Sequence, residues 1–256
     1  MATVAIAIML LLSALPIFAL SIAPAEHGAL DLNGSSTSTN WSGYAVVGGK
    51  GSVTDVKGSW IVPAIQGTCP STDQYSSHWV GIDGYKSSTV EQTGTDSDCQ
   101  GGVAVYNAWY EFYPHPSFTI NSLTISPGDT ITAEVKYMSN KFVVTITDTT
   151  TGHAFSISQK VNSAARSSAE WITEAPYSGG ILPLANFGTV SWGNDYTGIS
   201  STNYATVKGV TGPIGSFGSS VHSITMATSG GATKASPSPL SADNTSFTVT
   251  WVSSGP

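Results

Sequence analysis

The chain has 256 residues, of which only 10% are charged, and its formal net charge is −7 at pH 7. Because Lys and Arg form no cluster, nucleic acid is not expected as a partner. Glycine, serine and threonine are abundant and β-branched residues recur in short runs, which is typical of strands and turns rather than of a helical bundle or a disordered tail.

The first 21 residues are apolar almost throughout. Their length and position predict a secretory signal, and Ala23-Pro-Ala25 resembles the small residues near a cleavage site. An uncleaved membrane anchor also fits, because about 20 apolar residues span a bilayer and no Lys or Arg precedes Lys50. We expect a signal at 1–23, a short linker or pro-segment at 24–39, and one domain at 40–256. This mature domain is expected to be secreted, monomeric and free of membrane.

The chain has two cysteines, Cys69 and Cys99. In an exported protein, two cysteines predict one disulfide bond. The loop that this bond would close contains two segments of interest, at 79–84 and 91–94.

Short strands closed by glycine or proline turns are predicted along the whole chain. In order they cover residues 40–47, 53–62, 78–82, 91–94, 103–113, 130–138, 141–148, 153–161, 168–174, 187–192, 204–207, 223–226 and 246–252. Gln92 is expected just before a Thr-Gly turn, and residues 228–239 form the longest flexible loop. No segment predicts a convincing amphipathic helix. The pattern favours an all-β fold, a two-sheet antiparallel β-sandwich of the jelly-roll or concanavalin-like type.

The segment Trp79-Val-Gly-Ile-Asp-Gly84 places Trp79, Gly81 and Asp83 on one face, because alternate residues of a strand share a face. That face carries an indole, a glycine without a side chain and a carboxylate, so we interpret it as part of a cleft. The amide of Gln92 offers a donor and an acceptor, although the residue could merely cap a turn.

The aromatic run 103–113 has one ordinary core face and one mixed face. The mixed face interleaves aromatic and polar side chains: Asn107, Trp109, Glu111 and Tyr113. It suits substrate binding, and equally an amphipathic surface strand.

The segment 168–174 places Glu170 and Glu174 on one face. The two residues are four positions apart, so about 13 Å separates their α-carbons, and only one can act on the same water as Gln92. A solvent-facing strand edge is the alternative interpretation.

Several common chemistries lack their motifs in this chain. We find no zinc-ligand spacing, Gly-x-Ser-x-Gly, phosphate loop, dinucleotide fingerprint or paired-aspartate motif. Residues 95–98 (Thr-Asp-Ser-Asp) are a weak calcium signal and are more typical of a hydrated loop. No metal and no cofactor are therefore expected.

Five motifs follow one another along the chain: Asn40-Trp-Ser-Gly43, Trp79-Val-Gly-Ile-Asp-Gly84, Gln92-Thr-Gly94, Ala108-Trp-Tyr-Glu-Phe-Tyr-Pro114 and Ala169-Glu-Trp-Ile-Thr-Glu174. With residues 183–188 they resemble the glutamic peptidases, the eqolisin family of acid endopeptidases. The resemblance implies polypeptide substrates, a groove across one concave sheet and a catalytic pair at Gln92 and Glu174. It also implies that the cleft is lined by Trp79, Asp83, Trp109, Glu111 and Tyr113. Two departures are Asn107, where the family position can be acidic, and the short, non-basic segment before Asn40.

Such a pair makes chemical sense. A carboxylate can take a proton from water and pass it to the leaving amine, and an amide donates to the oxyanion at any pH. We therefore assign Glu174 as base and then acid, and Gln92 as water-positioner and oxyanion donor. The alternatives are a sugar-binding jelly roll and a glycoside hydrolase using Glu111 and Glu174, neither of which requires Gln92.

Overall fold

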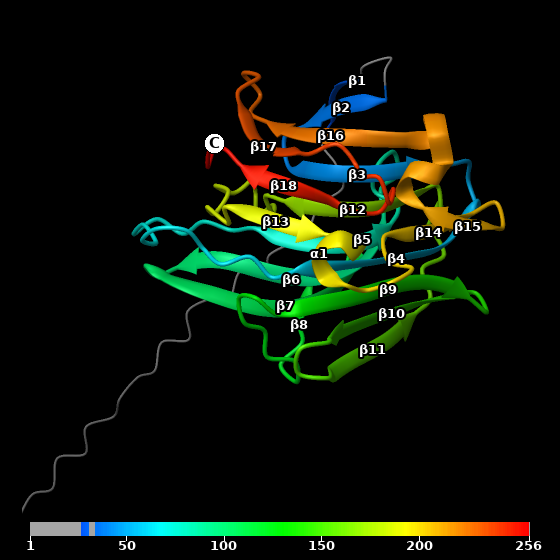
Figure 1. Cartoon of the computed structure of the whole chain (residues 1–256), viewed down its shortest axis with the longest axis horizontal. Coiled ribbons are helices and arrows are strands. Elements are labelled where there is room, and N and C mark those ends of the chain that lie inside the picture. Colours follow the sequence, from blue (N-terminus) through cyan, green and yellow to red (C-terminus); the bar gives the residue numbers. More distant parts are fainter. Residues whose placement is uncertain (1–26, 31–33, 256) are drawn as a thin grey trace, which may run out of the picture.

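The computed structural model describes residues 27–30 and 34–255, so the predicted signal at 1–23 lies outside the described residues (Figure 1). The strands within this part are β1 (His27–Leu30), β2 (Ser35–Ser38), β3 (Trp41–Val47), β4 (Val53–Ile61), β5 (Ser77–Ile82), β6 (Val90–Gln100), β7 (Val103–Tyr113), β8 (Phe118–Thr119), β9 (Thr130–Met138), β10 (Lys141–Asp148), β11 (His153–Gln159), β12 (Ser168–Glu174), β13 (Thr189–Trp192), β14 (Tyr204–Val207), β15 (Val210–Pro213), β16 (Val221–Ala227), β17 (Thr233–Pro237) and β18 (Phe247–Trp251). Helical structure in the described residues is confined to α1 (Asn194–Thr197) and the 3₁₀ segment η1 (Ile214–Ser220). Within the same ranges, no helix has the length and apolarity needed to cross a membrane.

The strands form two layers of one continuous folded sheet. The first layer has the antiparallel order β8-β7-β6-β5-β12-β3-β16, to which β2 adds in parallel. The second contains β11-β10-β9-β4, extended by β14–β15 and by β13–β18. Strand β17 pairs with both β16 and β18 and so joins the layers. The predicted all-β sandwich is confirmed.

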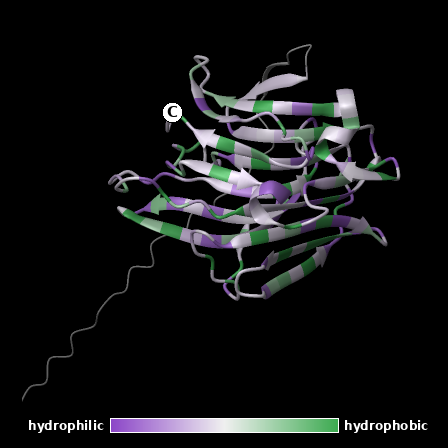
Figure 2. Cartoon of the chain, in the orientation of Figure 1, coloured by the Kyte–Doolittle hydropathy of each residue, from purple (hydrophilic) through white to green (hydrophobic). Residues whose placement is uncertain are grey.

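The main core lies between the layers. Alternate residues point inward, so apolar and polar bands alternate along many strands (Figure 2). In β10, Phe142, Val144 and Ile146 are buried while the residues between them are half-buried. Trp60 of β4 and Trp171 of β12, from opposite layers, belong to the same core.

A second cluster lies on the opposite face of the first layer. Its buried members are Trp41, Ala45, Trp79, Tyr85, Val90, Trp109, Ile172 and Ile224. We call this surface of β3, β5, β6, β7 and β12 the Trp79 face. By strand alternation it also carries Gln92, Glu111, Glu170 and Glu174.

Several local predictions are wrong. Gln92-Thr-Gly94 is not a turn, because it lies inside β6. A Cβ at Gly94 would lie 2.3 Å from the His78 carbonyl oxygen, so this glycine serves close packing of two strands. Residues 95–98 belong to β6 rather than to a loop. The expected loop 228–239 contains β17.

Regular structure also begins earlier than predicted. Strands β1 and β2 lie within the segment 24–39 that was interpreted as a linker. Strand β2 has an unremarkable Ser/Thr sequence, and it forms because β16 supplies a parallel partner for its backbone.

Candidate active site

Trp79 lies at the centre of the Trp79 face, and two glycines make room for it. It is opposite Ile172 of β12 and Gly94 of β6. A Cβ at Gly94 would lie 2.5 Å from the Trp79 Cβ, and a Cβ at Gly81 would lie 2.9 Å from its Cζ3. The indole therefore occupies the space of a side chain at position 81, and the close approach of β5 leaves no room for one at position 94. Trp41 packs edge-on against it, with ring centroids 4.9 Å apart.

Glu174 ends β12, between Trp41 of β3 and Ser77 of β5. Its Oε2 accepts a hydrogen bond from the Trp79 indole nitrogen at 3.0 Å, and its Oε1 accepts one from Asn40 Nδ2 at 3.2 Å. The carboxyl is fully buried, and both donors are neutral groups. Two neutral N–H groups thus fix its orientation.

Asn40 is itself oriented by Ser38. The Ser38 hydroxyl donates to Asn40 Oδ1 at 2.8 Å and accepts from the backbone N–H of Trp41 at 3.1 Å. Because Oδ1 receives the serine proton, the Asn40 Nδ2 group is directed to Glu174. The sequence motif contains Asn40, but nothing in the sequence indicates this contact.

Gln92 of β6 faces Gly81 of β5 on one side and Glu111 of β7 on the other. Its Nε2 donates to Glu111 Oε2 at 2.7 Å, and both side chains are fully buried. The same cross-strand row continues through Gly81 to Glu170 of β12. Glu174 lies four residues further along β12, opposite Ser77, so the strand pairing places Gln92 in the row of Glu170 rather than in that of Glu174. The Trp79 indole connects these rows, since its nitrogen contacts Glu174 and its Cζ3 lies beside Gly81.

Glu170 and Glu174 differ in their electrostatic environment. Burial raises the pKa of Glu170 well above its usual value, and the neighbouring carboxylates of Asp83 and Glu91 raise it further. Glu170 is therefore neutral in acid and unsuited to act as an ionised base. The Ser168 side chain lies close enough to lower the pKa of Glu170, but its effect is smaller than that of burial.

Asp83 has a structural task. Its carboxylate accepts hydrogen bonds from the backbone N–H groups of Arg166 and Ser167, at 2.6 and 2.8 Å, and from the Ser167 hydroxyl at 3.0 Å. It thereby holds the segment that leads into β12. The Asp83 carboxylate, which was predicted to line the cleft, is occupied by these contacts within the protein.

Asn107 and Tyr113 are half-buried at the two ends of the mixed face of β7. Asn107 is opposite Asp96, whose carboxylate accepts a hydrogen bond from Ser77 at 2.6 Å. Burial raises the pKa of Asp96 to about 7. Ser77 is in turn opposite Glu174, so one row joins Glu174 to the half-buried Asn107.

The Trp79 face is much less open than the sequence suggested. Trp79, Gln92 and Glu174 are 0% exposed and Trp109 is 2% exposed. Aromatic side chains from several strands form a cluster on this face. The alternative of a solvent-facing edge for β12 is wrong, since β12 is central and wholly buried.

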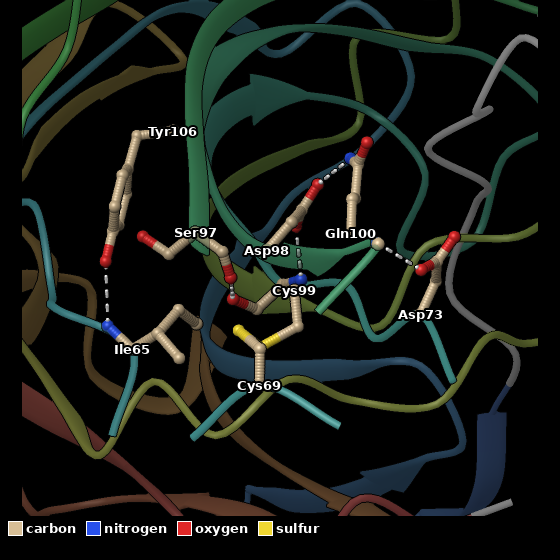
Figure 3. The surroundings of a disulfide bond; sticks show 10 residues. Ile65, Cys69, Asp73, Ser97, Asp98, Cys99, Gln100 and Tyr106 are labelled. Carbon is tan, nitrogen blue, oxygen red and sulfur yellow. Dashed lines mark hydrogen bonds between the residues drawn. A yellow bond between two sulfur atoms is a disulfide. The ribbon is translucent and has the colours of Figure 1, made fainter. Parts of the chain in front are cut away.

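The predicted disulfide bond is confirmed. Cys69 and Cys99 are joined by an S–S bond of 2.04 Å, which closes a loop across 30 positions (Figure 3). Beside it, Tyr106 accepts a hydrogen bond from the backbone N–H of Ile65 at 3.0 Å, and Asp98 accepts one from Gln100 at the same distance. The bond fixes the end of β6 to the loop before β5.

Metal-binding groups do not converge within residues 27–30 and 34–255. No three side chains of His, Cys, Asp or Glu lie together there in a way that could hold an ion. The chemistry available on the Trp79 face is that of a carboxyl, a carboxamide and an indole.

A sandwich with these groups on one sheet face corresponds to the glutamic peptidase class, and comparison with known proteins agrees. The Peptidase A4 family profile matches residues 39–248. Aspergillopepsin-2 of Aspergillus niger is 32% identical over 192 residues, which are 64% of this chain and 67% of the relative. Scytalidopepsin B of Scytalidium lignicola is 33% identical over 145 residues, 55% of this chain and 53% of the relative, so this chain spans about half of its length.

Comparison with solved structures also finds glutamic peptidases. Scytalido-glutamic peptidase with a transition state analog inhibitor superposes with a TM-score of 0.67 at 25% identity, over 84% of this chain and 98% of that one. Aspergilloglutamic peptidase from Aspergillus niger gives 0.58 at 32% identity, over 70% and 99% of the two chains. The chain belongs to the Peptidase A4 family and is a glutamic endopeptidase. The family resemblance inferred from the five motifs is thereby confirmed.

Proposed function

We propose that the chain is a secreted endopeptidase that acts in acid and hydrolyses polypeptides with Glu174 as general base and Gln92 as oxyanion donor. The observation that carries this assignment is the fixed orientation of Glu174 by Trp79 and Asn40. Gln92 is held in the same way by Glu111. Family membership argues against the sugar-binding and glycosidase alternatives.

The reaction would proceed in two proton transfers. Glu174 takes a proton from water while the water oxygen attacks the peptide carbonyl carbon. The Gln92 amide donates a hydrogen bond to the oxygen that becomes negative. Glu174 then gives the proton to the amide nitrogen, the C–N bond breaks, and the carboxylate is regenerated.

Acid activity follows from the choice of groups. The amide donor does not titrate, and no histidine or thiolate takes part. Activity is therefore lost only when Glu174 itself becomes protonated. Glu170 cannot substitute for it, because burial keeps that carboxyl neutral.

The surroundings suggest how substrate reaches the pair. Asn107 and Tyr113 are the half-buried members of the face at β7, and we assign them, with Trp79, Trp109 and Glu111, to the substrate path. Asp83 supports the path through the backbone of residues 166–167.

We also propose that residues 1–23 direct export and that the domain from residue 40 works as a monomer. The low charge content suits an acidic medium, since few ion pairs can be lost on protonation. N-terminal sequencing of the secreted protein and its sedimentation behaviour test these two points.

The decisive test compares three variants on a denatured protein substrate at acid pH. Glu174→Gln should abolish turnover, and Gln92→Ala should lower it on the order of 10²–10³-fold. Glu170→Gln should cost far less, because it replaces a neutral carboxylic acid by a neutral amide. Circular dichroism checks that each variant is folded, and polysaccharides serve as control substrates. Pepstatin-type inhibitors and chelators should leave the wild type active.

Two outcomes would overturn the proposal. If Glu174→Gln stays active while Glu170→Gln is dead, the wrong glutamate has been assigned. If both variants stay active, the two-residue mechanism is wrong.

A further inference from the structure

Lys234 of β17 is fully buried. Its backbone carbonyl accepts hydrogen bonds from the N–H groups of Val252 and Ser253, at 2.8 and 3.1 Å. Its methylene chain packs so closely against Gly255 that a Cβ there would lie 2.7 Å from the Lys234 Cε. Lysine is almost never fully buried unless it is paired. Within residues 27–30 and 34–255, no carboxylate lies within ion-pair distance of its ammonium group.

The Lys234 ammonium group contacts the segment 38–40, which orients Glu174. Nζ donates to the backbone carbonyl of Thr39 at 3.4 Å. Thr39 joins Ser38 to Asn40, and these two residues form the hydrogen-bond relay that ends on the Glu174 carboxylate. The buried cation and the carboxylate are therefore linked through one three-residue segment.

The charge balance of the surrounding strands makes this position unusual. Lys234 is the only Lys or Arg in the described strands β2, β3, β5, β6, β7, β12, β16, β17 and β18. The titratable groups of those strands, besides Lys234, are His78, Glu91, Asp96, Asp98, Glu111, Glu170, Glu174 and His222 together with the tyrosines. Burial lowers the pKa of Lys234 to about 8, so its ammonium keeps its charge throughout the acid range.

We propose that Lys234 is a positioning residue for Glu174, which fixes the segment 38–40 and supplies the positive charge that keeps the carboxylate ionised in acid. This inference rests on the proposed role of Glu174. It adds a residue outside the five motifs to the machinery of the acid reaction.

The effect on the pH profile can be given a size. Two charges on the order of 10 Å apart inside a protein shift each other's titration by roughly one pH unit. Loss of the Lys234 charge should therefore make Glu174 bind its proton at a pH roughly one unit higher. The acid limb of kcat/KM should move upward by that amount.

The test measures kcat and KM from pH 2 to 7 for Lys234→Met, Lys234→Arg and the wild type. Lys234→Met keeps an apolar chain of similar length, and we expect an acid limb about one unit higher and a kcat about tenfold lower on that limb, with KM unchanged. Lys234→Arg keeps the charge and should retain the wild-type limb. Lys208→Met, at an exposed turn, is the matched control and should also retain it.

A merely structural lysine gives a different result. If Lys234→Met lowers the unfolding temperature but leaves the acid limb in place, the proposal is wrong. Should this variant not accumulate, Ser38→Ala tests the same segment: released Asn40 should lower kcat with KM retained, and an unchanged kcat contradicts the inference. Glu174→Gln, measured in parallel, distinguishes failure of the proposed Lys234 role from failure of the proposed Glu174 role. If it is inactive while Lys234→Met has a normal profile, only the role of Lys234 fails.

Discussion

His78 should limit the stability of this protein in acid. The imidazole of β5 is fully buried, its Nδ1 lies 3.1 Å from the Thr173 hydroxyl, and its ring packs edge-on against Phe187. Its Nε2 has no hydrogen-bond partner among the described residues. Burial lowers the pKa of His78 from 6.5 to about 3, because a charged ring there would lose its hydration.

The sign of the effect follows from linkage. The unfolded chain binds the proton near pH 6.5 and the folded chain only near pH 3. The stability that neutral His78 contributes is therefore complete above pH 6.5 and is lost as the pH falls toward 3. The loss is about 3 kcal/mol at pH 4 and about 4 kcal/mol at pH 3.

The perturbation is His78→Asn, which keeps a polar atom near Thr173 but does not titrate. Its smaller volume lowers stability by a similar amount at every pH, so the informative quantity is the difference between pH 7.5 and pH 4. Urea unfolding should show that the variant loses about 3 kcal/mol less than the wild type over this interval. Both proteins should carry Glu174→Gln, so that self-digestion does not intrude.

His153→Asn, at the exposed start of β11, is the control and should follow the wild type. Parallel pH dependence in the His78→Asn variant and the wild type would show that the buried ring is protonated in the folded state at little cost. The reasoning about its burial would then be wrong.

Two further predictions concern stability. Replacing both Cys69 and Cys99 by serine should lower the free energy of unfolding on the order of 3–4 kcal/mol, because a loop of about 30 residues is released; urea unfolding would contradict this if the midpoint did not move. Burial, with a smaller effect of Asp83, raises the pKa of Glu91 from 4.5 to about 9. The stability that this neutral carboxyl contributes is therefore complete below about pH 4.5 and is lost as the pH rises toward 9. Glu91→Gln should therefore stay folded above pH 8 better than the wild type in near-UV circular dichroism, and equal alkaline stability would refute the assignment.

Most strands could be predicted because their apolar residues alternate and their turns contain glycine or proline. The segment 141–148 shows this well, since every second residue enters the core. The errors occur where a distant strand decides the structure. Gly94 looks like a turn residue, but the close approach of the β5 backbone at His78 and Trp79 requires it. Strands β2 and β17 have weak sequence signals and form because β16 lies beside them.

The candidate site was found from its motifs, whereas its contacts were not. Nothing in the sequence shows that Asn40 reaches Glu174 or that Lys234 reaches the same segment, because these pairs form only through the sheet order. The sequence also suggested an open face. It could not show that Trp41 and Trp79 would pack edge-on, since an aromatic strand face looks the same whether it binds a ligand or a neighbouring ring.

The central place of β12 in its sheet determines when the candidate site forms during folding. The partners of Glu174 lie far earlier in the chain, Asn40 by 134 positions and Trp79 by 95. Contacts across such distances form late, because long loops must close first. Until β12 enters between β3 and β5, the Glu174 carboxyl has neither of these partners. The strand order thus places assembly of the candidate site after the pairing of β12 with both neighbouring strands.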